Sequence, residues 1–413
     1  MKKKYIVLSI ITLVLLITFV TSFNYFKTSN NYVEDSVNNQ TKITKGISMN
    51  LDQTAGAGDY KTVTQSGWPT EGYEFNAELS KCENGSTLSW DDTNKKVIVS
   101  GNTLDKCYVY FDKLLVLSEV CGDKTLKDCV IAQYTGTQGQ NNIYYHKSSL
   151  SNGAGDNSYR YAGASDQVNN FVCFGSTTNP CPIDNLYRII GVIDGKVKLI
   201  KYDYANRNLL GTTGESPYYN SPPSKYQGTL TDIDIYHLNS SPSTNDWSVS
   251  QLNKTNLNTS FINNIGTTWA SKIITTTWKV GGGSWANIET SVPKTAYQYE
   301  VGSSASSTTY DAKIGSMYIS DYGFAASPSS WTTKLGSYNS NKSKNWLFLG
   351  SSEWTILRFN SNTTSVFYVG VDGSVSGSNV FSYSYAVRLT FSLLSSVTYA
   401  SGSGTSSDPI RIS

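Results

Sequence analysis

The N-terminal segment is the sequence feature that most constrains this chain. Lys2, Lys3 and Lys4 precede an almost wholly apolar run from Tyr5 to Val20. Extended to Phe23, the run approaches the roughly 20 residues with which a helix crosses a bilayer. Because a basic flank stays on the cytoplasmic side, the rest of the chain is predicted to be translocated.

Residues 1–23 fit either a signal anchor or a cleaved signal peptide, since both combine a basic start with an apolar stretch. Val20-Thr21-Ser22 offers small residues for cleavage after Ser22, whereas the length of the apolar run favours an uncleaved anchor. We therefore expect a single-pass protein of the cell membrane with an extracellular bulk, or a secreted protein if the signal is cleaved. Residues 24–43 are rich in Asn, Ser, Thr and Lys and predict a flexible stalk.

Charge and composition narrow the classes of partner. The 33 Lys and Arg residues nearly balance the 31 Asp and Glu residues, so the chain lacks the basic footprint of a nucleic-acid-binding protein. Charged residues make up only 15%, while Tyr (29) and Gly (33) are abundant, a composition typical of exported β-rich proteins. Tyrosine also supplies amphipathic contact area for recognition.

The cysteines predict disulfides. They form three close pairs along the chain: Cys82 with Cys107, Cys121 with Cys129, and Cys173 with Cys181. An even count in an exported chain favours disulfide bonds, and we predict these pairings although spacing alone cannot fix connectivity. Metal binding is the rival interpretation. No Cys-x-x-Cys occurs, and His146 and His237 show no ligand spacing to the cysteines, so we expect no metal and no cofactor.

Residues 44–113 predict a small β-sandwich-like module. Ile47, Met49 and Leu51 alternate with polar residues, and the segments 96–99 and 107–111 have strand character. A module of this size buries little surface, so a Cys82–Cys107 staple would add about 3 kcal/mol in the chain-entropy account.

Residues 114–413 predict an α+β, β-rich domain with a helical and loop-rich lead-in over 114–186. The lead-in starts with a helix at Leu115–Ala132 that Gly122 interrupts, and a loop continues to about Asn170. Asp194-Gly195 then joins two β-branched runs, which is a strong hairpin signal. The arm 187–193 is apolar on both faces and predicts a central strand. The arm 196–201 alternates, with its lysines expected outward.

Later segments alternate between helix and strand. A helix is expected at Trp247–Ile265, capped by Asn245 or Asp246, and a short one at Trp269–Ile274. Expected strands cover 275–280, 314–320, 353–358, 365–371, 374–375 and 386–394.

The region from about 159 to 413 resembles a family of surface domains from Gram-positive gut bacteria that look related to the C-type-lectin-like and formylglycine-generating-enzyme folds. The likeness rests on Tyr187–Gly191 with Leu199-Ile200, Trp247-Ser248 with Leu252-Asn253 and Phe261, Glu353–Ile356, Val371–Val375, Ala386–Arg388, and Ser401–Thr405 with the end at Ile412. Leu389 departs from the family, which usually has proline there. The resemblance implies a C-type-lectin-like domain over 114–413.

The sequence offers little catalytic chemistry. Formylglycine-generating enzymes use late cysteines, but the last cysteine here is Cys181, and the Glu-Pro-Asn and Gln-Pro-Asp triplets of calcium-dependent lectins do not occur. His146 and His237 are interpreted as loop or strand-end residues rather than catalytic bases. A carbohydrate hydrolase could use Glu353 with Asp321 or Asp372. The simpler interpretation has Glu353 solvated on a strand and Trp354 in the core.

We therefore expect a non-enzymatic surface binding or adhesion protein that recognises an extracellular protein or glycan. The alternatives are a cell-envelope carbohydrate hydrolase and a purely structural surface protein. In lectin-like folds late loops form the recognition face. Here these loops are 360–364 and 376–385, with candidate ligand-binding residues Asn360, Asn362, Asn379, Phe381, Tyr383 and Tyr385. Tyr383 and Tyr385 are two apart and point the same way in an extended segment.

The predicted topology can be tested with protease added to intact cells from which the thick wall has been removed. The part of the chain after residue 24 should be digested, because the Lys2–Lys4 cluster holds the N-terminus inside. Complete protection of that part in sealed cells, with digestion after lysis, would contradict the topology.

Overall fold

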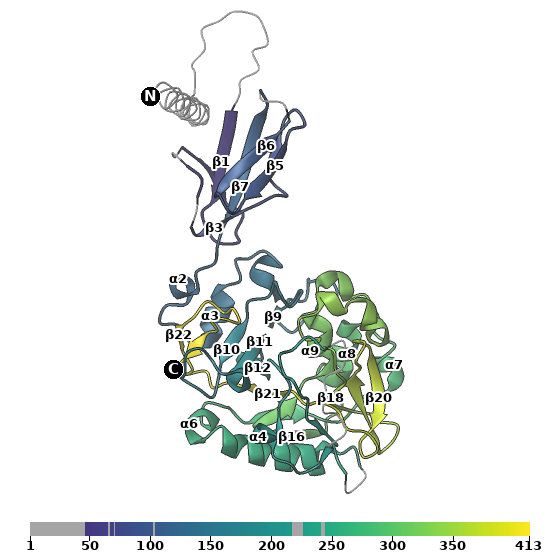
Figure 1. The fold of residues 1–413 in the computed structure, drawn as a ribbon. Helices are drawn as coiled ribbons and strands as arrows, with labels where there is room; N and C mark the ends of the chain where they lie inside the picture. The colour runs from purple at the N-terminus through teal and green to yellow at the C-terminus, as the bar shows by residue number, and fades with distance from the viewer. Residues whose placement is uncertain (1–45, 65–66, 70, 102–103, 217–225, 241–243) are drawn as a thin grey trace, which may run out of the picture. The chain divides into compact units, whose positions relative to one another are not determined.

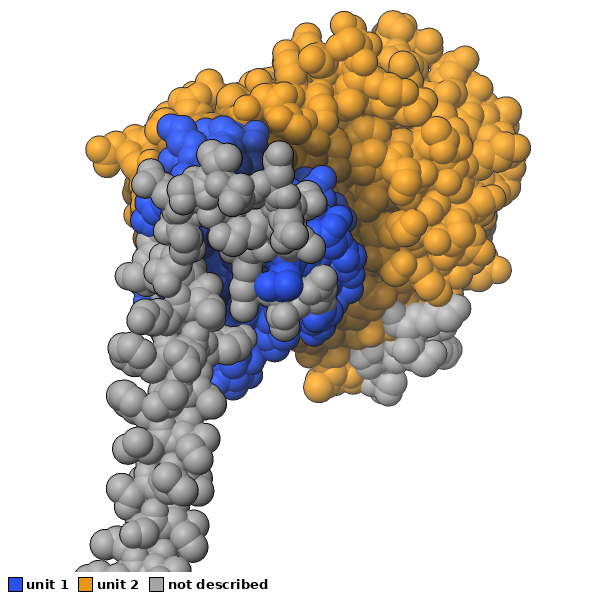
Figure 2. Space-filling view, turned by 90° about the horizontal axis from the view of Figure 1, so that it is seen from above, with its two compact units in different colours: residues 1–115 blue, residues 116–413 orange. Residues whose placement is uncertain are grey.

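The computed structural model describes residues 46–413 except 65–66, 70, 102–103, 217–225 and 241–243. The chain divides into two compact units, Met1–Leu115 and Val116–Ser413, which Figure 2 shows in different colours. This division lies close to the boundary expected between residues 113 and 114. The anchor or signal at 1–23 and the stalk at 24–43 lie outside the described residues. Within the described ranges, no helix combines the length and apolarity needed to cross a membrane.

The first unit is built from strands. They are β1 (Gly46–Asp52), β2 (Tyr60–Val63), β3 (Tyr73–Phe75), β4 (Lys81–Cys82), β5 (Thr87–Asp91), β6 (Lys96–Ser100) and β7 (Lys106–Lys113). One sheet has the order β2-β1-β7-β3, with β4 also pairing with β7, and β5 and β6 form a separate hairpin. The neighbours β1 and β7 run parallel.

The core of this unit lies between the sheet and the hairpin. Met49 and Leu51 from β1 and Phe111 from β7 are buried together with Val97 from β6. The Trp90 ring of β5 meets the Phe111 ring edge-on at 5.4 Å between centroids. The apolar alternation of β1 therefore turns one face toward the hairpin.

The second unit combines strands and short helices (Figure 1). Its strands are β8 (Ile143–Tyr145), β9 (Tyr159–Tyr161), β10 (Phe171–Cys173), β11 (Leu186–Ile193), β12 (Lys196–Lys201), β13 (Glu215–Ser216), β14 (Ile235–Tyr236), β15 (Thr276–Lys279), β16 (Thr309–Ala312), β17 (Ile314–Ser316), β18 (Glu353–Arg358), β19 (Ser365–Val369), β20 (Val375–Asn379), β21 (Leu389–Ser392), β22 (Tyr399–Ser401) and β23 (Arg411–Ile412). The largest sheet has the order β17-β21-β12-β11-β9-β8, with β10 also paired to β11. The α+β, β-rich class is confirmed.

The helices of this unit are short. The α-helices are α2 (Leu117–Cys121), α3 (Leu126–Ala132), α4 (Arg207–Leu210), α5 (Ile262–Asn264), α6 (Thr267–Ala270), α7 (Trp285–Ile288), α8 (Pro293–Glu300) and α9 (Ile319–Ala325). The 3₁₀ turns are η1 (Gln140–Asn142), η2 (Ile183–Asn185), η3 (Trp247–Val249), η5 (Pro328–Ser330), η6 (Leu335–Ser340) and η7 (Lys342–Lys344), and η4 (Leu252–Phe261) is π-helical.

The β11–β12 hairpin forms as predicted. Asp194 and Gly195 both have positive φ, 50° and 67°, as a two-residue turn between twisted strands requires. All of β11 except its last residue is buried, and β11 lies inside the largest sheet. The outward orientation expected for the lysines of β12 is wrong for Lys198 and Lys201. Lys198 and Lys201 are buried, because β21 pairs with β12 and other elements of the unit cover both faces.

The lead-in contains more structure than expected. Gly122, with φ 46°, separates α2 from α3, so the predicted helix is two helices with a reversal between them. The segment expected to be a loop up to Asn170 contains β8 and β9, which extend the largest sheet. Alternation over three residues is too short a pattern to reveal such strands.

The helix expected at Trp247–Ile265 is mostly π-helical. Asp246, one of the two cap candidates, accepts the Ser248 N–H at its carboxylate. Inside η4, the Asn258 side-chain amide also donates to the Asn253 carbonyl, at 3.1 Å. A π-helical turn turns side chains by a different angle per residue than an α-helix, and such turns are rare.

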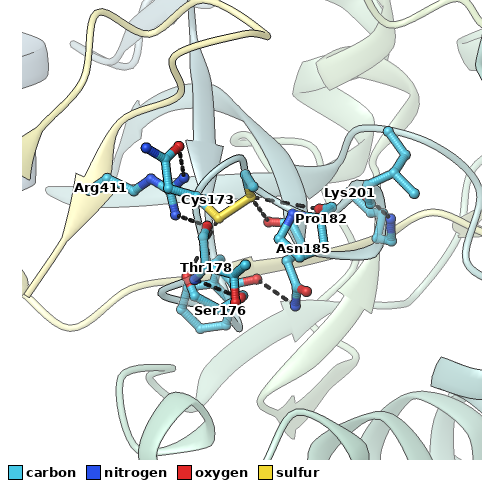
Figure 3. The surroundings of a disulfide bond; sticks show 11 residues. Cys173, Ser176, Thr178, Pro182, Asn185, Lys201 and Arg411 are labelled. Atoms are coloured by element: carbon cyan, nitrogen blue, oxygen red, sulfur yellow. Dashed lines mark hydrogen bonds between the residues drawn. A yellow bond between two sulfur atoms is a disulfide. The ribbon is translucent and has the colours of Figure 1, made fainter.

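The three predicted disulfides, Cys82–Cys107, Cys121–Cys129 and Cys173–Cys181, are all present. The third lies where the C-terminal segment returns to the sheet (Figure 3). In its loop, the Thr178 carbonyl accepts a hydrogen bond from the Arg411 guanidinium at 2.8 Å. The first joins β4 to β7 at positions that are directly paired.

Removing the first disulfide should loosen the first unit. In Cys82→Ala/Cys107→Ala, amide hydrogen exchange in β1 and β7 should rise by about 100-fold, since a cross-link of this loop length contributes about 3 kcal/mol. Mass spectrometry of the corresponding peptides measures it. The matched control Cys173→Ala/Cys181→Ala, in the other unit, should leave those peptides unchanged. Equal exchange in wild type and the first variant would contradict the expectation.

Candidate functional site

The first predicted recognition loop, 360–364, lies at the end of the small sheet β18–β19–β20 where β19 begins and β20 ends. The prediction of a loop over 376–385 is wrong for 376–379, which form β20. Only 380–385 is loop, and it leads back to Ala386 beside Glu353 at the start of β18. Ser365, which follows the first loop, pairs with Asn379 at the end of β20. The Val380 N–H also donates to the Thr364 carbonyl at 3.0 Å. Strand pairing therefore joins the two loops, and Figure 1 shows the sheet beside α7, α8 and α9.

A stack of aromatic rings leads from the core to the surface beside this sheet. Trp354 is 1% exposed, and its ring lies 4.5 Å from that of Tyr385. The Tyr385 ring stacks on Tyr368 at 4.5 Å and lies 6.3 Å from that of Tyr383, nearly parallel to it. Tyr383 is 56% exposed and Phe381 is 39% exposed. The predicted shared side of Tyr383 and Tyr385 is confirmed.

The inner part of this stack is held in place by polar contacts. The Tyr385 hydroxyl lies 3.0 Å from the Ser378 hydroxyl. Tyr385 also exchanges two backbone hydrogen bonds with Tyr236, whose carbonyl accepts the Trp354 indole N–H at 2.7 Å. Burial raises the pKa of Tyr385 to about 12, so this ring remains neutral at physiological pH. Tyr385 therefore supports the face, while Tyr383 lies at its exposed end.

His237 belongs to the same framework. Its Nδ1 lies 3.1 Å from the Tyr383 carbonyl, so the imidazole is engaged with the loop backbone. No catalytic partner is hydrogen-bonded to this ring among the described residues. The histidine fixes the loop that presents Tyr383.

Two of the predicted ligand-binding asparagines shape the loops. The Asn362 Oδ1 accepts the N–H groups of Thr364 and Ser365, and the Asn379 Oδ1 accepts those of Phe381 and Ser382. Such side-chain-to-backbone bonds are the usual reason for asparagine in turns. Asn360 is exposed in the first loop.

Sequence reasoning missed the residue that closes the first loop. Asn245 is 2% exposed, and its amide donates to the carbonyls of Phe359, Asn362 and Ser365. The sequence predicts only a helix cap for Asn245 or Asp246, and Asp246 fills that role. No local pattern signals such contacts, because the acceptors are more than a hundred residues away.

The carboxylates considered for a hydrolase are committed elsewhere. Glu353 is 2% exposed and makes a two-pronged ion pair with Arg388 at 2.9 Å, so the expectation of a solvated Glu353 is wrong. Trp354 is in the core, as expected. Asp372 accepts the Ser374 N–H within a turn. Asp321 is buried and forms ion pairs with Arg160 and Lys198.

A polar depression of about 500 Å³ lies near α4. Its lining includes Arg207 and Asp234, which form an ion pair at 2.8 Å, and Arg207 also pairs with Glu215. The Arg207 guanidinium therefore holds both the Glu215 and the Asp234 carboxylates. Both acids are committed to this ion-pair network, so the depression does not supply a hydrolase pair.

A buried charge cluster connects β9, β12 and α9. The Arg160 guanidinium is paired with Asp156 at 2.8 Å and with Asp321 at 3.3 Å. The Lys198 ammonium approaches Asp321 from the other side at 2.5 Å. Removing one member of such a pair would leave a buried charge without its counter-ion, at a cost of about 3–5 kcal/mol. No local sequence pattern indicates that these residues are internal.

His146 borders this cluster. Its Nδ1 accepts the Ala154 N–H at 3.0 Å, and its ring packs against Phe324 and Trp331. Nε2 has no hydrogen-bond partner within the described part of the chain. Burial, with the charge of Arg160, lowers the pKa of His146 to about 3. This histidine is a neutral core residue rather than a base exposed to a substrate.

Searches against protein-family models, curated proteins and solved structures give no match. Among the residues that the structure describes, no three His, Cys, Asp or Glu side chains converge as metal ligands would.

The burial of His146 predicts acid sensitivity of the second unit. The unfolded chain takes up a proton near pH 6.5, whereas the native pKa is about 3, so stability is lost as the pH falls through this window. Between pH 7 and 4.5 the loss from this group should be about 3 kcal/mol.

The comparison variant is His146→Gln, which cannot ionise and should lose less stability over that range. Urea unfolding at both pH values, followed by tryptophan fluorescence, measures the difference. This signal comes mainly from the second unit, because only Trp68 and Trp90 lie outside it. The same pH dependence in both proteins would show that His146 is not responsible.

Proposed function

We propose that this chain is a non-enzymatic surface protein that binds an extracellular protein or glycan through the face around Tyr383. The proposal depends on the aromatic stack, in which the rings become more exposed from the core outward. Trp354 is buried and packs on Tyr385, and Tyr385 packs on the exposed Tyr383. Exposed tyrosines on a fixed base offer large contact area at low entropic cost. Phe381 and Asn360 extend the face as candidate contacts.

The proposed location is the outer face of a cell membrane, with residues 1–23 as the anchor, or the medium if that segment is cleaved. Three disulfides support an exported chain, because such bonds persist in oxidising compartments. A C-type-lectin-like architecture for the second unit is part of the same proposal. Its support is the display of late segments beside the small sheet β18–β19–β20.

The rival functions have less support. Glu353, Asp321 and Asp372 each hold a structural contact, which leaves the hydrolase without a free acid and base pair among the candidates considered. A purely structural role would not require Tyr383 to stand 56% exposed on an ordered stack. Measuring both binding and stability in single variants distinguishes a binding role from a purely structural one.

The binding face is tested with Tyr383→Ala on the exported chain. A glycan and protein array first identifies the ligand, and affinity should then fall by about 2 kcal/mol, or roughly 30-fold, with little change in melting temperature. Tyr385→Ala should instead lower stability by about 3 kcal/mol, because it removes a packed ring.

The matched control is Trp285→Ala. Trp285 is 43% exposed and packs against Phe359, which stacks with Phe367. Phe367 and its neighbour Tyr368 point to opposite faces of the sheet, so Trp285 tests an exposed aromatic away from the Tyr383 face. Unchanged affinity in Tyr383→Ala, or an equal loss in both variants, would contradict the proposed face.

A further inference from the structure

The Lys198–Asp321 pair differs from the other lysine–carboxylate pairs in the described part of the chain. Its side chains are 7% and 3% exposed, with the Lys198 Nζ 2.5 Å from the Asp321 Oδ2. In every other such pair found there, both side chains are at least 33% exposed. An amine and a carboxyl group are therefore held in contact away from water.

The surroundings of the pair are aromatic. The Lys198 Nζ lies 4.7 Å from the centre of the Tyr318 ring and 5.5 Å from that of Trp278. Burial lowers the pKa of Lys198, although Asp321 acts in the opposite direction. An apolar site disfavours the charged ammonium, which brings the neutral amine closer to it in free energy. A neutral amine is a nucleophile, and an ammonium is not.

We infer that Lys198 and Asp321 condense to an intramolecular amide that links β12 to α9. A proton first passes from the ammonium to the Asp321 Oδ2, which gives a neutral amine and a carboxylic acid. The Lys198 nitrogen lone pair then forms a bond to the Asp321 Cγ. The Cγ–Oδ2 bond breaks, and the oxygen leaves as water with the acid proton and one proton from nitrogen. No oxidant, reductant or other reactant is needed.

The residues around Asp321 suit this step. The Arg160 guanidinium lies 3.3 Å from Oδ1, the oxygen that becomes negative while nitrogen adds to Cγ, so its charge stabilises the intermediate. The Tyr318 N–H donates to Oδ2 at 3.0 Å and fixes the orientation of the carboxyl group.

Glu300 acts as a positioning residue. Its carboxylate accepts the N–H groups of Ile319 and Ser320, the two residues before Asp321, each at 2.8 Å. These contacts fix the start of α9, and holding two reactants in contact is itself a large contribution to rate.

The amide would close a much longer loop of the chain than the disulfides do. It joins residues 123 positions apart, whereas the two disulfides of the same unit each span 8. Reduction opens a disulfide and leaves an amide intact. This covalent tie between the largest sheet and α9 would persist in a reducing medium, and it does not depend on what the Tyr383 face binds.

Peptide mapping of the full chain tests the link directly. The protein is reduced, alkylated, denatured and digested with trypsin. The expected product joins Val197–Lys201 to Ile314–Lys334, with a mass lower than the sum of the two by one water. Trypsin should fail to cut after Lys198, because its amine is acylated, and should cut after Lys201. Lys201 is the internal control, since it is also buried on β12 but donates to the Ile183 carbonyl.

Recovery of the separate peptides Leu199–Lys201 and Ile314–Lys334, with no joined product, would overturn the inference. The variant Lys198→Arg keeps the positive charge but cannot form the amide, so the joined peptide should disappear. Circular dichroism checks that this variant is folded. A joined peptide that persists in the variant would show that Lys198 is not the amine involved.

Discussion

The burial of β12 on both faces is the constraint on which most of the second unit depends. This strand carries Lys198 and Lys201 into the interior, where an ammonium without a partner is costly. Asp321 at the start of α9 neutralises Lys198, and Arg160 from β9 pairs with the same carboxylate. One acidic residue therefore fixes the position of α9 relative to two strands, β9 and β12, that come much earlier in the sequence.

The first and the last segments of the second unit are hydrogen-bonded to each other. The Leu126 N–H donates to the Val397 carbonyl, and the Phe171 N–H donates to the Gly404 carbonyl. Ile410 forms a bridge with Val172, which places the C-terminus next to β10 and β22 (Figure 1). Residues 397–410 thus complete hydrogen bonds that residues 126–173 would otherwise leave open. These contacts hold the C-terminal strands in place. A loop between such strands can present side chains with little loss of entropy on binding.

The Tyr383 face shows how this frame supports a surface. Tyr236 and Asn245 come from segments more than a hundred residues before the loops that they hold. Their backbone and amide contacts fix Tyr385 and Asn362, and Tyr383 projects beyond them. The exposed aromatic surface is thus a product of distant buried polar contacts, which also explains why the residues nearest the face divide into supports and candidate contacts.

The sequence by itself determined features whose causes are local. Asp194-Gly195 specified a turn through positive φ, close cysteine spacing in an exported chain indicated the disulfides, and the apolar run 187–193 indicated a covered strand. Only the tertiary structure decided what lies opposite each side chain. The lysines of β12 alternate like a solvated strand, and their burial depends on β21 and α9, which follow more than a hundred residues later. Likewise, β9 is a strand only because β11 pairs with it, and β8 only because it pairs with β9. Glu353 is internal only because Arg388 meets it there.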